Sequence, residues 1–230
     1  MPKTYRSSYG RLQGLPAVFT VNTFVRMTGF DRHAAQTVLS RWTARGLLQQ
    51  AGPRAAIYFN LVVDRRGGDT YWARAVQEAY PSATLAGESV LHAAGWTTQI
   101  PAAQALAVQS RRSYVAIHGA DIRGRSLAWF RAAFQAGAIL RAEDVEFATY
   151  GLRTLSPAWA LADLYADPSV WHPDPDDLDI PHKAWPAVRH AFQALDLGAN
   201  ESAQRILLEM AAAPTLTAAA QSRPRERPAS

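Results

Sequence analysis

Residues 19–60 read FTVNTFVRMTGFDRHAAQTVLSRWTARGLLQQAGPRAAIYFN, and this stretch decides how the N-terminal part of the chain folds. Thr20 precedes a short apolar-periodic segment that stops at Gly29, and Asp31 precedes a longer one. Ser, Thr and Asp are favoured at helix N-caps, and glycine is favoured just beyond helix C-termini. The pattern therefore predicts a short helix ending before Gly29, a tight turn, and a second helix over 32–45.

The second helix has one apolar face and one polar face. Its apolar residues recur at spacings of three and four: Ala35, Val38, Leu39 and Trp42. The opposite face carries His33, Gln36, Thr37, Ser40 and Arg41. This polar face holds donors and acceptors but no carboxylate, which is the side-chain chemistry that pairs with base edges in the DNA major groove. We expect these five residues to contact DNA bases.

The chain after this helix predicts a β-hairpin. Two leucines begin the first strand, residues 51–54 make the turn, and Ile57 and Phe59 return on alternate positions. One face of the hairpin is therefore expected to pack on the helices. Helix, turn, helix and hairpin follow one another in a winged helix-turn-helix, which lays its second helix in the major groove. We predict such a DNA-binding domain over residues 1–66.

The charge distribution supports a phosphate-binding surface in this domain. Residues 1–66 hold ten Lys and Arg against two acids, whereas residues 151–222 hold four basic residues against nine acids. A basic face is the electrostatic footprint of a nucleic-acid-binding protein. A first helix is expected over residues 3–14. The residues expected near the DNA backbone, or on the wing, are Lys3, Arg6, Arg11, Thr20, Asn22, Arg45 and Arg54.

A second domain is predicted over residues 70–213, after the Asp-Arg-Arg-Gly-Gly-Asp boundary at 64–69. Its pattern mixes helices with short strands, so the fold class is α+β: a winged helix-turn-helix, then a small mixed α/β domain and C-terminal helices. The expected helices are 71–79, 82–95 and 156–165, and the expected strands are 105–108, 115–117 and 145–149.

Two further helices are expected near the C-terminus, over 182–195 and 200–212. We expect them to pack as an antiparallel pair on the second domain. The alternative is that this region supplies a dimerisation helix. Residues 214–230 are Ala, Pro and Arg with few apolar anchors, and we expect them to be disordered.

Catalytic patterns are weak throughout the chain, and we expect neither an enzyme nor a cofactor or metal site. Glu88 and His92 stand four apart but lack further metal ligands. The acids of residues 172–179 are interrupted by two prolines and predict a solvated connector, with a cation-binding or basic-partner site as the alternative. The chain contains no Walker loop, no GxGxxG motif and no serine nucleophile elbow.

Composition favours a cytoplasmic protein without a membrane contact. The chain has no cysteine, which excludes disulfides, cysteine-bound zinc and thiol nucleophiles and fits a reducing compartment. No apolar run approaches the roughly 20 residues needed to span a bilayer, and the basic first residues lack the apolar core of a signal peptide.

Two segments of the second domain resemble one protein family. In residues 80–101, YPSATLAGESVLHAAGWTTQIP, the matching positions are Ser89, Leu91, His92, Gly95, Trp96, Thr97 and Pro101. In residues 151–168, GLRTLSPAWALADLYADP, they are Ser156, Pro157 and Asp163. These segments resemble the corresponding parts of AbiEi-type antitoxins, in which an N-terminal winged helix precedes such a domain. The resemblance covers roughly residues 15–170.

The resemblance implies a dual role. Proteins of this family repress their own operon by binding inverted repeats, and they counteract a co-transcribed nucleotidyltransferase-like toxin of abortive phage infection. We therefore expect double-stranded DNA of its own promoter and a cognate toxin as partners. Two alternatives stay open: a ligand-responsive winged-helix transcription factor not linked to a toxin, and a winged helix that binds proteins rather than DNA.

Overall fold

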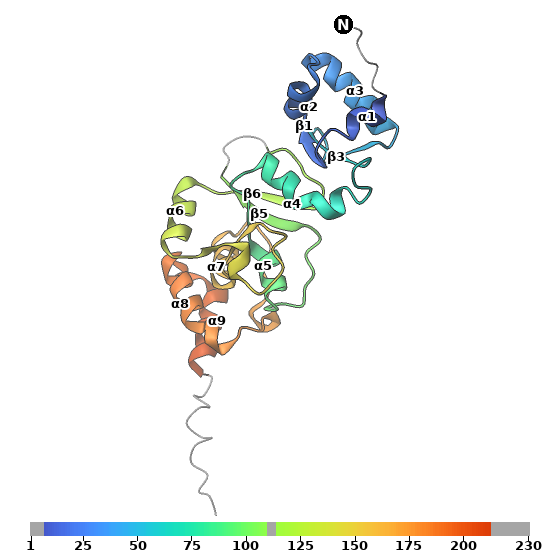
Figure 1. The fold of residues 1–230 in the computed structure, drawn as a ribbon. Helices are drawn as coiled ribbons and strands as arrows, with labels where there is room; N and C mark the ends of the chain where they lie inside the picture. Colours follow the sequence, from blue (N-terminus) through green and yellow to red (C-terminus); the bar gives the residue numbers. More distant parts are fainter. Residues whose placement is uncertain (1–6, 110–113, 213–230) are drawn as a thin grey trace, which may run out of the picture.

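The protein has a mixed α+β fold in two lobes (Figure 1). The structure is a computed structural model that describes residues 7–109 and 114–212. An N-terminal unit, residues 7–60, forms the smaller lobe, and a second region, residues 68–212, forms the larger one. The predicted disordered tail, 214–230, lies outside the described residues.

The N-terminal unit contains three helices and a three-stranded antiparallel sheet of order β1-β3-β2. Val18 and Gln49 of the two outer strands both lie opposite Phe59 of the central strand. The elements are α1 (Ser8–Leu12), β1 (Val18–Thr20), α2 (Val21–Thr28), α3 (Arg32–Ala44), β2 (Leu48–Gln50) and β3 (Ile57–Asn60). Of the first helix predicted over 3–14, the described part is this single short turn of helix, α1.

Both faces of the small sheet contribute side chains to a hydrophobic core. Phe19 and Tyr58 face the helices of the N-terminal unit, and their rings stack at 5.9 Å between centroids. Val18, Ile57 and Phe59 face the other way and belong to the core of the second region. The prediction that Ile57 and Phe59 pack on the helices is therefore wrong. The reason is that β3 is apolar at successive positions, so that alternation alone does not tell which face the helices cover.

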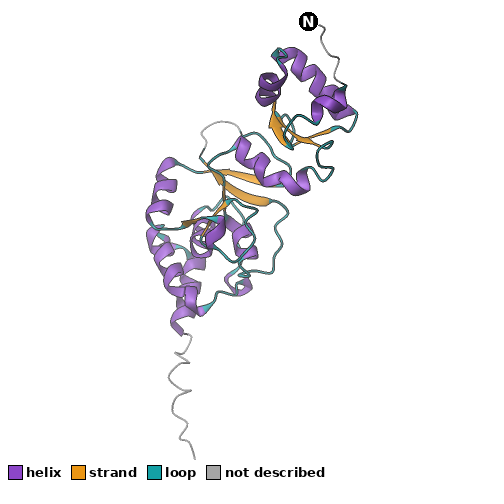
Figure 2. Ribbon diagram, in the orientation of Figure 1, coloured by secondary structure: helices purple, strands orange, loops and turns teal. Residues whose placement is uncertain are grey.

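The second region is built around a five-stranded mixed sheet of order β6-β5-β4-β8-β7, with helices packed around it (Figure 2). Its strands are β4 (Thr84–Leu85), β5 (Gln104–Val108), β6 (Ala120–Gly124), β7 (Ile139–Leu140) and β8 (Arg153–Leu155). Its helices are α4 (Gly68–Ala79), α5 (Gly87–Ala93), α6 (Leu127–Gln135), α7 (Pro157–Ala166), α8 (Trp185–Ala194) and α9 (Glu201–Ala212), with short 3₁₀ turns η1 (Ala142–Asp144), η2 (Pro175–Asp177), η3 (His182–Ala184) and η4 (Leu197–Ala199).

Several predicted elements are confirmed and others are wrong. The helices predicted over 71–79 and 156–165 form as α4 and α7, and the strand over 105–108 forms as β5. The strands predicted over 115–117 and 145–149 do not form. The backbone of Val115 bonds instead with the Tyr80 hydroxyl, and the Ile117 side chain is buried, so these apolar residues anchor a loop rather than extend a sheet.

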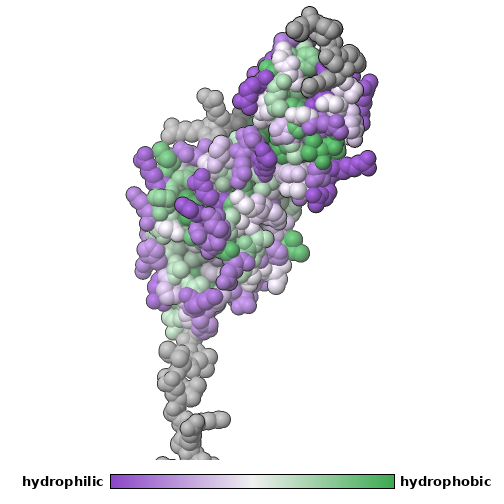
Figure 3. Space-filling model, viewed as in Figure 1, coloured by the Kyte–Doolittle hydropathy of each residue, from purple (hydrophilic) through white to green (hydrophobic). Residues whose placement is uncertain are grey.

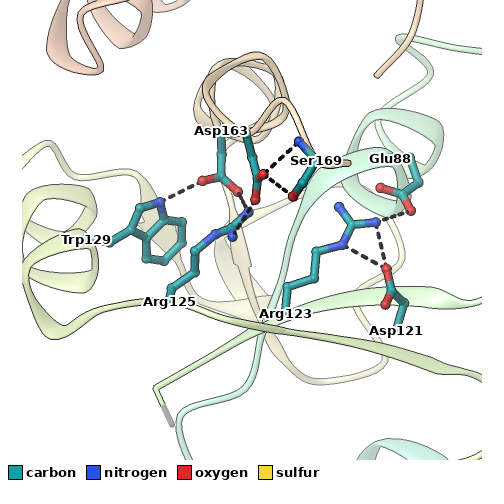
Figure 4. Close-up of polar contacts among 8 residues, drawn as sticks. Glu88, Asp121, Arg123, Arg125, Trp129, Asp163 and Ser169 are labelled. Atoms are coloured by element: carbon teal, nitrogen blue, oxygen red, sulfur yellow. Dashed lines mark hydrogen bonds and ion pairs between the residues drawn. The ribbon is translucent and has the colours of Figure 1, made fainter. Parts of the chain in front are cut away.

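Two arginines, one in the edge strand β6 and one just after its end, bond to the helices beside it (Figure 4). Arg123 donates to Glu88 of α5 at 2.7 Å, and Arg125 donates to Asp163 of α7 at 2.9 Å. The other carboxylate oxygen of Asp163 accepts from the Trp129 indole at 2.7 Å. Because these charges lie away from water, each needs its partner, and together they fix β6 against the core.

The C-terminal helices pack on the core of the second region. Phe192 of α8, and Ile206 and Met210 of α9, are buried in it. Asn200 caps α9 by accepting from the Ala203 N–H at 3.0 Å. The acidic segment before them is exposed, as predicted, but is also bound to α9, because Arg205 pairs with Asp174 and Asp176.

Within the described residues, no helix combines the length and the hydropathy required to cross a bilayer. Figure 3 shows hydrophilic side chains along the edges of the N-terminal unit and a hydrophobic area over α6, where Leu127 and Phe134 are exposed.

Candidate nucleic-acid interface

Local side-chain chemistry sets the ends of α2 and α3. The Thr20 hydroxyl accepts from the Thr23 N–H at 3.1 Å and begins α2. Gly29 ends α2 in the left-handed conformation, at φ 71°, which a residue with a side chain rarely adopts. The Asp31 carboxylate then accepts from the Ala34 N–H at 2.9 Å and begins α3. The turn between the two helices is therefore as tight as the sequence predicted.

An aromatic cluster holds the two helices at a fixed angle. The ring of Phe24, on α2, meets Trp42 of α3 edge-on at 5.6 Å and stacks on Phe30 of the turn at 5.7 Å. Phe24 is fully buried, and Ala35 and Leu39 of α3 close the same core. Such packing leaves α3 with one buried side and one side open to solvent.

The open side of α3 carries all five residues predicted to contact bases: His33, Gln36, Thr37, Ser40 and Arg41 are exposed. The Thr37 hydroxyl donates to the His33 carbonyl at 3.1 Å, so its proton is already committed within the helix. The side chains of the other four residues make no hydrogen bond or ion pair with any described residue. Their donors and acceptors are therefore available to a partner.

The residues predicted near phosphates divide into three groups. Asn22, Arg45 and Arg54 are exposed. Thr20 is half-buried with its hydroxyl used as a helix cap, and Arg11 is half-buried with its guanidinium over the Phe30 ring at 5.4 Å. The remaining two, Lys3 and Arg6, lie outside the described residues.

The hairpin turn lies against the second region rather than standing free. The Ala51 carbonyl accepts from the His118 N–H at 2.9 Å. Gly52 is buried, and a Cβ atom there would lie 2.0 Å from the Ala116 carbonyl oxygen. Arg54 is exposed at the end of this turn, with a left-handed φ of 59°. The tip of the predicted wing is therefore partly covered, and Arg54 lies at the margin of the contact.

Positive charge surrounds α2 and α3. Residues 7–60 contain six arginines and a single acid, Asp31, and none of those arginines forms an ion pair with a described residue. The hydrogen bond from the Ala34 N–H lowers the pKa of Asp31, which keeps this helix cap ionised. Two of the arginines, Arg26 and Arg32, are exposed and were not among the predicted contacts. The signal for Arg26 was its position four residues after Asn22, on the same face of α2.

The Glu88 and His92 side chains do not bond to each other, and each keeps one buried polar atom without a partner among the described residues. Glu88 pairs with Arg123 rather than His92. No group of three or more His, Asp or Glu residues among the described residues is arranged to hold a metal ion. Glu143, Asp144 and Glu146 are exposed around the turn η1.

Comparison with known proteins places few constraints on this chain. No family model matches it. No curated protein matches it. Among solved structures, it is similar to the RV2827C protein from Mycobacterium tuberculosis, with 15% sequence identity and a TM-score of 0.47 over 87% of this chain and 78% of that one. The fold class of this protein, α+β, follows from its own helices and two sheets.

Proposed function

We propose that the N-terminal unit is a winged helix-turn-helix that binds double-stranded DNA, with α3 in the major groove. One observation carries the proposal: α3 is anchored by an aromatic core on one side and presents five exposed polar residues, free of carboxylates, on the other. The unpaired arginines of the unit supply the positive field that phosphates require.

Three of the five exposed polar residues of α3 have a base partner that their chemistry suits. The Gln36 amide fits the N6 and N7 atoms of adenine, and the Arg41 guanidinium fits O6 and N7 of guanine. The Thr37 hydroxyl donates its proton to the His33 carbonyl within the helix. Its methyl group is therefore available to contact a thymine methyl, and its oxygen can accept a hydrogen bond. Asn22, Arg26 and Arg45 are exposed, and in this proposal they contact phosphates and set the register on the duplex.

We further propose that the protein represses its own promoter and acts as the antitoxin of an AbiE-like system. The resemblance of residues 80–101 and 151–168 to AbiEi-type antitoxins supports this role. We propose no catalytic role for the buried carboxylates Glu88 and Asp163, each of which pairs with an arginine.

DNA binding is tested by titrating the protein's own promoter in gel-shift assays at rising salt. Arg41→Ala and Gln36→Ala are each expected to weaken specific binding by about 1–3 kcal/mol and to relax selectivity at one position. Arg45→Ala is expected to weaken binding to all sequences alike and to lower the slope of log affinity against log salt by about one.

Arg189→Ala is the matched control, because Arg189 is an exposed arginine of α8 in the second region. It should leave both affinity and salt slope unchanged. If Arg41→Ala and Gln36→Ala bind the promoter as tightly and as selectively as the parent, α3 is not the recognition helix. A protein-binding role for the unit is the outcome favoured if no DNA is bound at low salt.

The antitoxin role is tested separately by co-expression with the neighbouring gene. The expected result is that the gene arrests growth when expressed alone and that this protein relieves the arrest. If this protein does not relieve the growth arrest, the proposed antitoxin role is wrong, whereas the proposed DNA binding is unaffected.

A further inference from the structure

A half-open cavity of about 380 Å³ lies where the N-terminal unit meets the second region. Residues from both sides line it: Gln49 of β2, Asp69 and Trp72 of α4, Gln104 of β5, and His118 and Tyr150 from two loops. Its volume falls in the range of small-molecule sites, which are most common at the junctions between domains. Nothing in the proposed DNA-binding role uses these residues.

One wall of the cavity is aromatic and rigid. The Trp72 indole donates to the His118 carbonyl at 2.8 Å, which fixes the plane of its ring. The Tyr150 ring meets it edge-on at 5.6 Å between centroids. Tyr150 is 57% exposed and has a left-handed φ of 56°, a conformation that costs a non-glycine residue about 1–2 kcal/mol. The ring is therefore held at the mouth of the cavity at an energetic cost.

Several polar side chains of the cavity have no partner among the described residues. The side chains of Asp69, Gln104 and His118 make no hydrogen bond or ion pair with any described residue. Gln49 uses its amide oxygen to accept from the Gly68 N–H, at 3.5 Å, so its NH₂ group stays free. The described lining contains one carboxylate and neither lysine nor arginine. It therefore repels anions and offers several acceptors to a donor.

We propose that this cavity binds a flat aromatic molecule that bears amino or amidine N–H donors and no negative charge. The Trp72 and Tyr150 rings provide surfaces on which such a molecule stacks, and a cationic one gains a further attraction to their faces. The Asp69 carboxylate and the Gln104 carbonyl oxygen accept its N–H groups. An aromatic acid of the same size meets the uncompensated charge of Asp69 and is excluded.

Binding in this cavity is coupled to the hairpin, and this part of the inference rests on the proposed DNA-binding function. Gln49 belongs to the hairpin that carries the Ala51–His118 hydrogen bond, whereas Asp69 and Trp72 belong to the second region. A molecule that touches both sides favours the hairpin position that keeps the Ala51–His118 hydrogen bond. Its occupancy therefore changes how readily the hairpin moves on DNA binding, and with it the affinity for DNA.

Isothermal calorimetry on the full chain tests the cavity without DNA. Adenine and benzamidine are the probes, and benzoate is the anionic comparison. Adenine and benzamidine are expected to bind with millimolar or tighter affinity, and benzoate is expected not to bind. Absence of heat with both probes at millimolar concentration, or equal binding of benzoate, overturns the proposal.

Two variants locate the binding to these residues. Tyr150→Asn removes the ring while keeping a residue that tolerates the left-handed conformation, and it should weaken both probes by about three- to tenfold. Asp69→Asn removes the charge and should weaken benzamidine more than adenine. The control is Phe134→Ala, an exposed aromatic residue of α6 outside the cavity, which should change neither. Unchanged binding in both cavity variants would show that the probes bind elsewhere.

Gel shifts on the promoter, with and without saturating adenine, then test the coupling. The expected result is a change in DNA affinity that disappears in Tyr150→Asn. If calorimetry shows that adenine binds but DNA affinity does not change, the proposed coupling is wrong, whereas the proposed ligand binding in the cavity is still supported. If the protein binds no DNA at all, the proposed function is wrong. The calorimetry still tests, independently of DNA, whether the cavity binds the probes.

Discussion

At the scale of single residues, Asp163 makes the most important polar contacts of any buried side chain in the second region. It is 4% exposed, and its two carboxylate oxygens accept separately from Arg125 and from the Trp129 indole. Asp163→Asn replaces a charged acceptor with a neutral one beside a buried guanidinium. The expected loss is about 1.5–3 kcal/mol in the free energy of unfolding, measured by urea denaturation.

Asp176→Asn is the comparison for this variant. Asp176 also pairs with an arginine, Arg205, at 2.9 Å, but both side chains are largely exposed. Exposed pairs contribute less than about 1 kcal/mol, so this variant should unfold almost as the parent does. Equal losses in the two variants would mean that burial does not strengthen the Asp163 contacts.

At the scale of elements, the docked hairpin turn depends on a residue without a side chain. A Cβ at Gly52 would meet backbone atoms of Ala116 and Ile117, which have no freedom to rotate away. Gly52→Ala is therefore expected to destabilise the protein by about 1–3 kcal/mol and to push the turn off the second region. Urea denaturation measures the first effect, and faster hydrogen exchange at the His118 amide, which donates to Ala51, reports the second.

Gly198→Ala controls for the general effect of replacing glycine. Gly198 lies in a 3₁₀ turn with an ordinary φ and no atom within 4 Å of an added Cβ. This variant should match or slightly exceed the parent in stability, because alanine restricts the unfolded chain. A Gly52→Ala protein that behaves like Gly198→Ala would contradict the tight contact with Ala116.

The elements also show which features a sequence can specify. The ends and faces of α3 were predictable because Asp31, Gly29 and the spacing of apolar residues act within a few positions of one another. The orientation of β3 was not predictable from the sequence. Ile57, Tyr58 and Phe59 are all apolar, so the strand lacks the alternation of polar and apolar residues that would identify its buried face. Likewise, α6 was missed although Ser126 caps it by accepting from the Trp129 N–H.

At the scale of the whole molecule, the two lobes share a core. Val18, Ile57 and Phe59 of the N-terminal unit are buried in the same cluster as Trp159 and Leu161 of the second region. We therefore expect one cooperative unfolding transition. Hydrogen exchange measured by mass spectrometry in rising urea should give α3 and α7 the same free energy of opening. Opening of α3 at much lower urea than α7 would show that the lobes unfold independently.

The candidate sites differ in how far they were predictable at this scale. The exposed face of α3 lies within nine residues of sequence, so its periodicity reveals it. The cavity at the junction brings together Gln49, Trp72, Gln104 and Tyr150, which are separated by long stretches of chain. No spacing rule connects such residues, because their proximity is created only when the small sheet docks on α4.

The double burial of β3 also limits how this protein can evolve. A small domain whose sheet has one face open to solvent can be joined to different partner domains during evolution. Here β3 offers its Tyr58 side to one lobe and its Ile57 and Phe59 side to the other. If recombination joined this N-terminal unit to an unrelated domain, the side of β3 that now packs on the second region would lose its partner. Its apolar side chains would then be exposed to solvent. The two lobes are therefore expected to be inherited together, with changes on one side of the junction matched on the other.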